Sequence, residues 1–226
     1  AIRTRLEFLL KRKDKMVICV TSTESGDGKT FLSTNLAALY SMTGKKTLLI
    51  DLDLRKPNIH TKLGLENGMG MSNYLIGDCE IEDILMTNTP FGFDLMRAGT
   101  VPPNPGELVH SDKMTNMINA MREKYDYIVM DTSPIGLVPD AYALINNSDL
   151  CLYVIRCMQT NKSFCKQTLE QMMEVVDNTE KVQIVLSDIP TEGRHSYGSG
   201  YGYGYGGYGG YGYGHLGYGG YGGYGY

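Results

Sequence analysis

The chain has 226 residues, 42% of them hydrophobic, and a formal net charge of −4. This length suits one domain with a sizeable core, and the negative charge argues against a nucleic-acid-binding surface, which needs clustered Lys and Arg. Five cysteines without a C-x-x-C pair predict reduced thiols and a cytoplasmic setting. No apolar run approaches ~18 residues, so the sequence predicts neither a membrane span nor a signal peptide.

The first 13 residues have an amphipathic pattern. Ile2, Leu6, Leu9 and Leu10 stand at helical spacing with charged residues between them. This spacing predicts a helix with one apolar side. Two partners for that side stay open: the rest of its own domain, or another subunit.

Residues 17–30 predict a strand, a phosphate-binding loop and the start of a helix that continues over 31–40. Glycines let main-chain N–H groups face phosphate oxygens, and the helix N-terminus adds its positive dipole end. Lys29 supplies a point charge, and the Thr30 hydroxyl is a ligand for Mg²⁺. The usual G-x-x-x-x-G-K-[ST] pattern has its first glycine where this chain has Thr23. A glycine turn with an ordinary surface lysine is the alternative.

A second strand, within residues 46–57, ends in Asp51 and Asp53. Strand periodicity aims the two carboxylates the same way, unless the strand ends between them. The carboxyl ends of strands are where open α/β sheets bind ligands. Helix caps or loop salt bridges are the alternative explanation of these two aspartates.

The middle of the chain predicts a helix, a strand, a proline-rich loop and another helix. Residues 72–89 resemble a short helix with Ile81, Ile84 and Leu85 turned inward, and residues 91–97 a strand. The loop is Ala98-Gly-Thr-Val-Pro-Pro-Asn-Pro-Gly, and the helix that follows runs from Glu107 through Met121.

The remaining strands complete the predicted sheet. The apolar run that ends in Asp131 delivers a carboxylate of the Walker B type, which holds Mg²⁺ directly or through water. Two further strands, 150–155 and 182–186, flank a helix over 162–176. Strands that alternate with helices predict a parallel sheet with right-handed crossovers.

The composition changes completely over residues 197–226, which hold 11 tyrosines and 16 glycines. No core-forming pattern is present, so we expect disorder and a tether of about 30 Å. A low-complexity spacer is one interpretation. The other is a set of accessible phosphoacceptors, namely Tyr197, Tyr201, Tyr203, Tyr205, Tyr208, Tyr211, Tyr213, Tyr218, Tyr221, Tyr224 and Tyr226.

These motifs resemble those of the bacterial tyrosine kinases of polysaccharide export, over nearly the whole chain. Residues 22–30 are similar to the family's Walker A segment, with Ser25 where the family usually has proline. Leu49-Ile-Asp-Leu-Asp-Leu-Arg-Lys-Pro57 matches its second aspartate motif, often called Walker A′. Residues 98–108, Asp131-Thr-Ser-Pro134 and the tyrosine cluster are also family-like.

The resemblance implies a Rossmann-like P-loop NTPase of the α/β class, with a mainly parallel sheet flanked by helices, related to the MinD/ParA-type ATPases. Residues 1–196 would form the kinase domain and residues 197–226 a flexible tail. The implied activity is transfer of phosphate from Mg-ATP to tyrosine, between neighbours in a ring. The ring helix of the family places Arg3 at its first arginine and Leu6 at the second, with Arg5 beside it, so oligomer contacts are expected at Arg3 and Arg5.

The resemblance also implies roles for site residues. Lys29 would neutralise the β- and γ-phosphates, and Thr30 and Asp131 would hold Mg²⁺. Asp51 and Asp53 would share metal positioning and acceptance of the tyrosine proton, in an order that stays open. Asp188 stands where relatives often have an asparagine near the adenine. The expected ATP contacts are Ser25, Gly26, Asp27, Gly28, Lys29, Thr30, Phe31 and Asp188.

The expected setting is the inner face of a bacterial cell membrane. A membrane-spanning co-polymerase region, fused upstream or supplied as a separate activator, and a tyrosine phosphatase are the implied partners. Two other functions compete with the kinase: an ATPase switch of the MinD/ParA type, in which water accepts the phosphate, and a non-enzymatic assembly regulator. The tyrosine cluster and the Pro-Pro-Asn-Pro loop favour the kinase.

Overall fold

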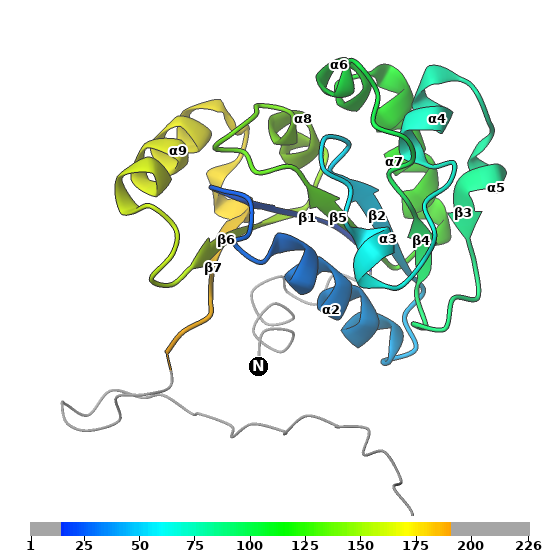
Figure 1. Ribbon diagram of the computed structural model, residues 1–226, viewed down its shortest axis with the longest axis horizontal. Helices are drawn as coiled ribbons and strands as arrows, with labels where there is room; N and C mark the ends of the chain where they lie inside the picture. Colours follow the sequence, from blue (N-terminus) through cyan, green and yellow to red (C-terminus); the bar gives the residue numbers. More distant parts are fainter. Residues whose placement is uncertain (1–14, 191–226) are drawn as a thin grey trace, which may run out of the picture. The chain divides into compact units, whose positions relative to one another are not determined.

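The structure is a computed structural model that describes residues 15–190 (Figure 1). Within this range seven strands form one sheet in the order β3-β4-β2-β5-β1-β6-β7. All neighbours pair in parallel except β3 and β4, which are antiparallel. The strands are β1 (Met16–Ser22), β2 (Thr47–Leu52), β3 (Leu85–Met86), β4 (Asp94–Met96), β5 (Tyr127–Thr132), β6 (Leu150–Arg156) and β7 (Val182–Ser187).

The central strands are buried along their whole length, which explains why their sequences are continuous apolar runs. Every residue of β1, β2 and β5 is buried. A parallel strand with helices on both faces has no solvent side and therefore shows no alternation of polar and apolar residues. The predicted mainly parallel sheet is confirmed.

Helices cover both faces of this sheet (Figure 1). One face packs Met16, Ile18 and Val20 of β1 against α2 and α3. The opposite face packs Val17 and Cys19 of the same strand against the other α-helices. The helices are α2 (Lys29–Ser41), α3 (Ile59–Lys62), α4 (Met71–Ile76), α5 (Ile81–Ile84), α6 (Pro105–Val109), α7 (Asp112–Lys124), α8 (Ala141–Asn146), α9 (Lys162–Val175) and the 3₁₀ helix η1 (Thr179–Lys181).

Two of the helix predictions are wrong. The segment 72–89 is not one helix, because Gly77 adopts a left-handed conformation (φ 93°) that ends α4, and Leu85 begins β3. The helix predicted from Glu107 through Met121 is two helices. Pro105 starts α6 earlier than expected, and the Ser111 side chain accepts a hydrogen bond from the Met114 N–H and starts α7 anew.

Other predictions fall outside the described range. These are the amphipathic helix at residues 1–13, the boundary between residues 196 and 197, and the tyrosine-rich segment. No helix between residues 15 and 190 is long and apolar enough to span a membrane.

The strand order brings three carboxyl ends together at one edge of the sheet. β5 lies between β2 and β1, with Asp51 of β2 opposite Asp131 of β5 and Val20 of β1 opposite Asp131 on the other side. The loops that follow these three strands therefore meet at one place, which is where open α/β sheets bind ligands.

Candidate active site

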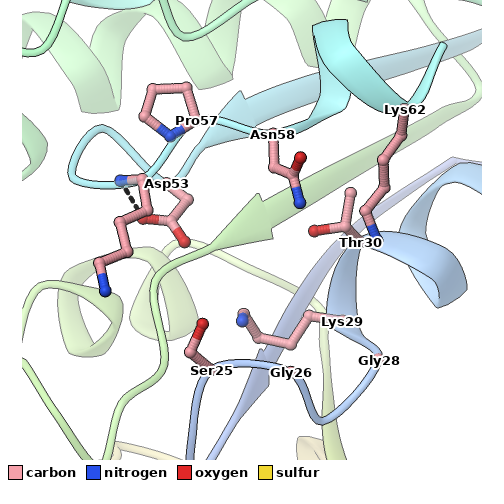
Figure 2. Close-up of a pocket in the computed structure, with 10 residues that line it drawn as sticks. Ser25, Gly26, Gly28, Lys29, Thr30, Asp53, Pro57, Asn58 and Lys62 are labelled. Carbon is pink, nitrogen blue, oxygen red and sulfur yellow. Dashed lines mark hydrogen bonds between the residues drawn. The ribbon is translucent and has the colours of Figure 1, made fainter.

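The loop between β1 and α2, here called the P-loop (residues 23–28), borders a cavity of about 370 Å³ (Figure 2). Gly26 (φ 93°) and Gly28 (φ 103°) adopt left-handed conformations, which L side chains rarely take. The segment between β2 and α3 forms the other wall. The lining residues are Ser25, Gly26, Gly28, Lys29, Thr30, Asp53, Lys56, Pro57, Asn58 and Lys62.

Asp131 is a buried carboxylate beside the first turn of α2. Its Oδ1 accepts a hydrogen bond from Ser33 Oγ at 3.0 Å. Burial raises the pKa of Asp131 to about 6, and this rise is opposed by the Thr30 hydroxyl bond, the Lys29 charge and the Ser33 bond. Lys29 and Thr30, the first residues of α2, are thus neighbours of Asp131, as the sequence predicts.

Asp51 and Asp53 face different surroundings, because β2 ends at Leu52, between them. Asp51 is buried, and its two oxygens accept main-chain N–H groups of Asp53 (3.2 Å) and Ile59 (3.3 Å). Burial, with the Asp131 charge as the second cause, raises the pKa of Asp51 well above its usual range. Its bond to Ile59, the first residue of α3, is the helix-start contact that the alternative explanation anticipated.

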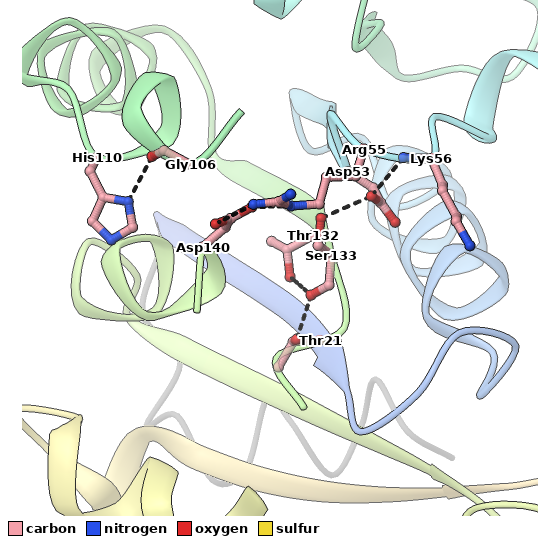
Figure 3. A network of polar contacts seen from close by, with 9 residues as sticks. All are labelled: Thr21, Asp53, Arg55, Lys56, Gly106, His110, Thr132, Ser133 and Asp140. Atoms are coloured by element: carbon pink, nitrogen blue, oxygen red, sulfur yellow. Dashed lines mark hydrogen bonds and ion pairs between the residues drawn. The ribbon is translucent and has the colours of Figure 1, made fainter. Parts of the chain in front are cut away.

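Asp53 lines the cavity. Its Oδ1 accepts hydrogen bonds from Ser133 Oγ (2.8 Å) and from the Lys56 N–H (3.1 Å). Ser133 is held in turn, because Thr21 Oγ1 donates to its main-chain oxygen at 3.0 Å (Figure 3). One oxygen of Asp53 is therefore held by two hydrogen bonds, and no hydrogen bond within the described range engages its Oδ2.

An ion pair braces the same segment from outside the cavity. The Arg55 guanidinium donates to both oxygens of Asp140, at 2.7 and 3.1 Å (Figure 3). Asp140 immediately precedes α8 and is buried. The bidentate bond and the Asp140 charge raise the pKa of Arg55. Two parallel bonds fix direction as well as distance, so the loop that carries Asp53 has a defined position.

The two remaining acidic residues predicted to contact ATP have side chains that brace the loops. Asp27 accepts hydrogen bonds from the Glu24 N–H (2.9 Å) and from Thr160 Oγ1 (2.8 Å). Asp188 follows β7 and pairs with Arg156 at 3.1 Å, and Arg156 also donates to the main-chain oxygen of Gly26 at 3.2 Å. Neither carboxylate lines the cavity.

Phe31 does not line the cavity either. It lies on α2, and 69% of its surface is exposed. The predicted contacts that do line the cavity are Ser25, Gly26, Gly28, Lys29 and Thr30.

Sequence reasoning missed several residues of the site. Lys56 and Pro57 stood in the quoted aspartate motif but received no role, and Ser133 stood in the Asp-Thr-Ser-Pro motif. Asn58 immediately precedes α3 and Lys62 ends it. Neither carries a local signal in the sequence, because only the packed fold brings them to the cavity.

Metal ligands at this site are few. Across residues 15–190 no group of three or more His, Cys, Asp or Glu side chains is arranged to hold a metal ion. Mg²⁺ commonly binds through one or two protein oxygens together with substrate phosphates and water. The buried Asp131 beside the Thr30 hydroxyl fits that sparse pattern.

Gly136 packs directly against the main chain of the P-loop, so a larger residue at this position should destabilise the fold. A Cβ at this position would lie 2.4 Å from the main-chain oxygen of Thr23. Because that backbone cannot move aside as a flexible side chain can, we expect Gly136→Ala to lower the free energy of unfolding by about 3 kcal/mol, measured by chemical denaturation. The control is Gly44→Ala, where a Cβ meets nothing within 4 Å but φ is +78°; the expected cost is about 1 kcal/mol. Equal losses in both variants would contradict the prediction.

Comparisons with known proteins agree with this geometry. The family model described as AAA domain matches residues 15–186. The putative tyrosine-protein kinase CapB of Staphylococcus aureus is 33% identical over 196 residues, which are 87% of this chain and 85% of that protein. The tyrosine-protein kinase etk of Escherichia coli is 34% identical over 174 residues, which are 76% of this chain but 24% of that longer protein.

Solved structures give the same result. The kinase domain of etk superposes with a TM-score of 0.79 at 28% identity, over 89% of this chain and 78% of that one. The septum site-determining protein MinD of Pyrococcus horikoshii, solved with Mg-ADP, shares the fold with a TM-score of 0.59 at 21% identity, over 75% of this chain and 68% of that one. The identity with CapB over most of both chains, together with the superposition on the kinase domain of etk, shows that this chain belongs to the family of bacterial tyrosine-protein kinases.

Proposed function

We propose that this tyrosine-protein kinase transfers the γ-phosphoryl group of Mg-ATP to the tyrosines of residues 197–226, in trans between neighbouring copies. The observation that carries the proposal is the cavity, which joins a glycine-rich helix start and Lys29 to the partly free carboxylate of Asp53. A phosphate site and a proton acceptor face the same space. Phosphoryl transfer needs in-line positioning and relief of negative charge more than covalent help.

The phosphates would be held from the P-loop side. The main-chain N–H groups from Gly26 to Thr30 and the start of α2 supply partial positive charge, and Lys29 supplies a full one. Thr30 and Asp131 would hold Mg²⁺, which supplies further positive charge at the phosphates when it is bound. Asp51 accepts the main-chain N–H groups of Asp53 and Ile59. Through these two bonds it would position Asp53 and the start of α3.

The attacking tyrosine would be served by Asp53. A phenol has a pKa of about 10, so at neutral pH it needs a nearby carboxylate to take its proton as it attacks. The new bond joins the tyrosine oxygen to the γ-phosphorus, the bond from that phosphorus to ADP breaks, and the proton passes to Asp53. The lining position of Asp53 and its unengaged oxygen support this assignment over Asp51.

The cellular setting extends the proposal. The enzyme would act at the inner face of a bacterial cell membrane in polysaccharide synthesis and export, in a ring that uses Arg3 and Arg5, with a tyrosine phosphatase reversing the modification. The activating co-polymerase region would be fused or separate. The lengths of the relatives are compatible with both arrangements, since the chain spans 85% of CapB but 24% of the longer etk.

The test is intact mass after incubation with Mg-ATP. We expect mass steps of one phosphate each, located in residues 197–226 by fragment analysis, and a loss of at least about 100-fold in rate for Lys29→Met, because a preorganised charge at the transferring group is removed. Lys124→Met is the matched control, since Lys124 is exposed at the end of α7, away from the cavity. ATP consumption without added mass would instead favour the ATPase switch.

A further inference from the structure

Two of the lysines that line the cavity have no role in the proposed transfer. The same cavity is lined by Lys56, which follows β2, and by Lys62, the last residue of α3. Both lysines are exposed. Neither forms an ion pair with an acidic residue of the described range 15–190.

The charges around the cavity are unbalanced. Its lining includes three lysines but one carboxylate, that of Asp53. Lys29 lies close enough to Asp131 to lower the pKa of that carboxyl, whereas neither Lys56 nor Lys62 forms an ion pair with Asp53, the carboxylate that lines the cavity. An ammonium group on a flexible stem binds phosphate as a point charge. The unpaired charges of Lys56 and Lys62 therefore suit a second anion in the cavity, besides the phosphates of ATP.

The acceptor sequence supplies such an anion once the reaction has begun. Tyr201, Tyr203 and Tyr205 are two residues apart, and Tyr208 and Tyr211 are three apart. An extended chain spans at most about 3.3–3.6 Å per residue, so the main chain between neighbouring tyrosines can reach over at most roughly 7–11 Å. A tyrosine that has received phosphate carries about −1.5 to −2 charges. When the next tyrosine lies at Asp53, the phosphate on its neighbour is therefore near enough to reach other residues that line the cavity.

We propose that Lys56 and Lys62 form a phosphotyrosine subsite beside the acceptor position. A tail segment that already carries one phosphate is then a better substrate than an unmodified one, and phosphorylation spreads along the tail in clusters. This proposal rests on the proposed function, because it takes the tyrosine-rich segment as the acceptor.

The test uses the full chain and two labelled peptides with the sequence of residues 201–213. Both keep Tyr205 as the single acceptor, with phenylalanine at the other tyrosines, and the primed peptide carries phosphotyrosine at position 203. We expect kcat/KM for the primed peptide to be about fivefold higher at low salt, the size that two exposed lysine–phosphate pairs contribute. The preference falls as salt rises, because exposed charges are screened. Fluorescence anisotropy with an ATP analogue gives the affinity of each peptide independently of transfer.

The decisive variant is Lys56→Gln/Lys62→Gln, in which the ratio of the two kcat/KM values and the ratio of the two affinities fall to about one. Lys124→Gln/Lys166→Gln, which removes two exposed lysines outside the cavity, retains both ratios. Equal handling of the two peptides by the unmodified kinase, weaker use of the primed peptide, or an unchanged preference in Lys56→Gln/Lys62→Gln would each overturn the subsite while leaving the kinase intact. If neither peptide is phosphorylated, the proposed function fails, and the affinities alone still decide the subsite.

Discussion

Asp53→Asn is expected to lower kcat for tyrosine phosphorylation by about 10³-fold while changing ATP affinity by only a few-fold. Positioned general bases contribute about 10²–10⁴ to rate. The loss is confined to chemistry because an asparagine side-chain oxygen can still accept the bonds from Ser133 Oγ and the Lys56 N–H that hold this side chain. The substitution replaces only the other oxygen, Oδ2, with an amide NH₂ group, which does not accept the tyrosine proton.

Three measurements separate chemistry from binding and folding. Single-turnover rates report the chemical step, calorimetric titration with an ATP analogue reports nucleotide affinity, and denaturation reports the fold. The control is Asp78→Asn, because Asp78 is exposed on the turn after α4; its rate should equal that of the unmodified kinase. If Asp53→Asn lost ATP affinity to the same extent as rate, Asp53 would belong to the metal site rather than to the acceptor.

The sequence predicted the sheet well because its central strands are buried on both faces. The continuous apolar runs before the P-loop, before Asp51 and before Asp131 allow few alternatives, and β1, β2 and β5 lie on these runs. The helices that failed are short and depend on single residues. Gly77 and Ser111 end or start a helix through backbone conformation and capping, which apolar periodicity does not report. The helix α8 was also missed, because its six residues are fewer than the about 11–18 over which helical periodicity is read.

The site was predicted through its local motifs and not through its long-range contacts. Lys29, Thr30 and Asp131 follow from strand ends and a glycine loop, which are sequence features. The different surroundings of Asp51 and Asp53 depend on where β2 ends, on Ser133 from β5 and on Ile59 from α3. The Arg55–Asp140 pair joins residues 85 positions apart. Such partners are set by the packed fold, so one sequence without its structure does not specify them.

Asp131→Asn is expected to stabilise the metal-free protein at neutral pH while abolishing kinase activity. Burial raises the pKa of Asp131 to about 6, whereas an unfolded aspartate has a pKa of about 3.9. A carboxyl group that binds its proton more tightly in the folded state stabilises the fold fully below the unfolded pKa. That contribution is lost as pH rises through 6. The difference of about 2 pKa units corresponds to about 3 kcal/mol in the free energy of unfolding.

The measurement is denaturation in EDTA from pH 4 to pH 8. We expect Asp131→Asn to match the unmodified protein near pH 4 and to exceed its free energy of unfolding by up to about 3 kcal/mol near pH 7.5, since an asparagine needs no ionisation and still accepts the Ser33 bond. Asp78→Asn, at an exposed carboxylate, should shift stability by less than about 0.5 kcal/mol at any pH. Added Mg-ATP should then stabilise the unmodified protein more than Asp131→Asn, because Asp131 is the proposed metal ligand. Parallel pH curves for the two proteins would contradict the prediction, because they would show that Asp131 has the same pKa in the folded and the unfolded state, with its burial fully offset by Lys29, Thr30 and Ser33.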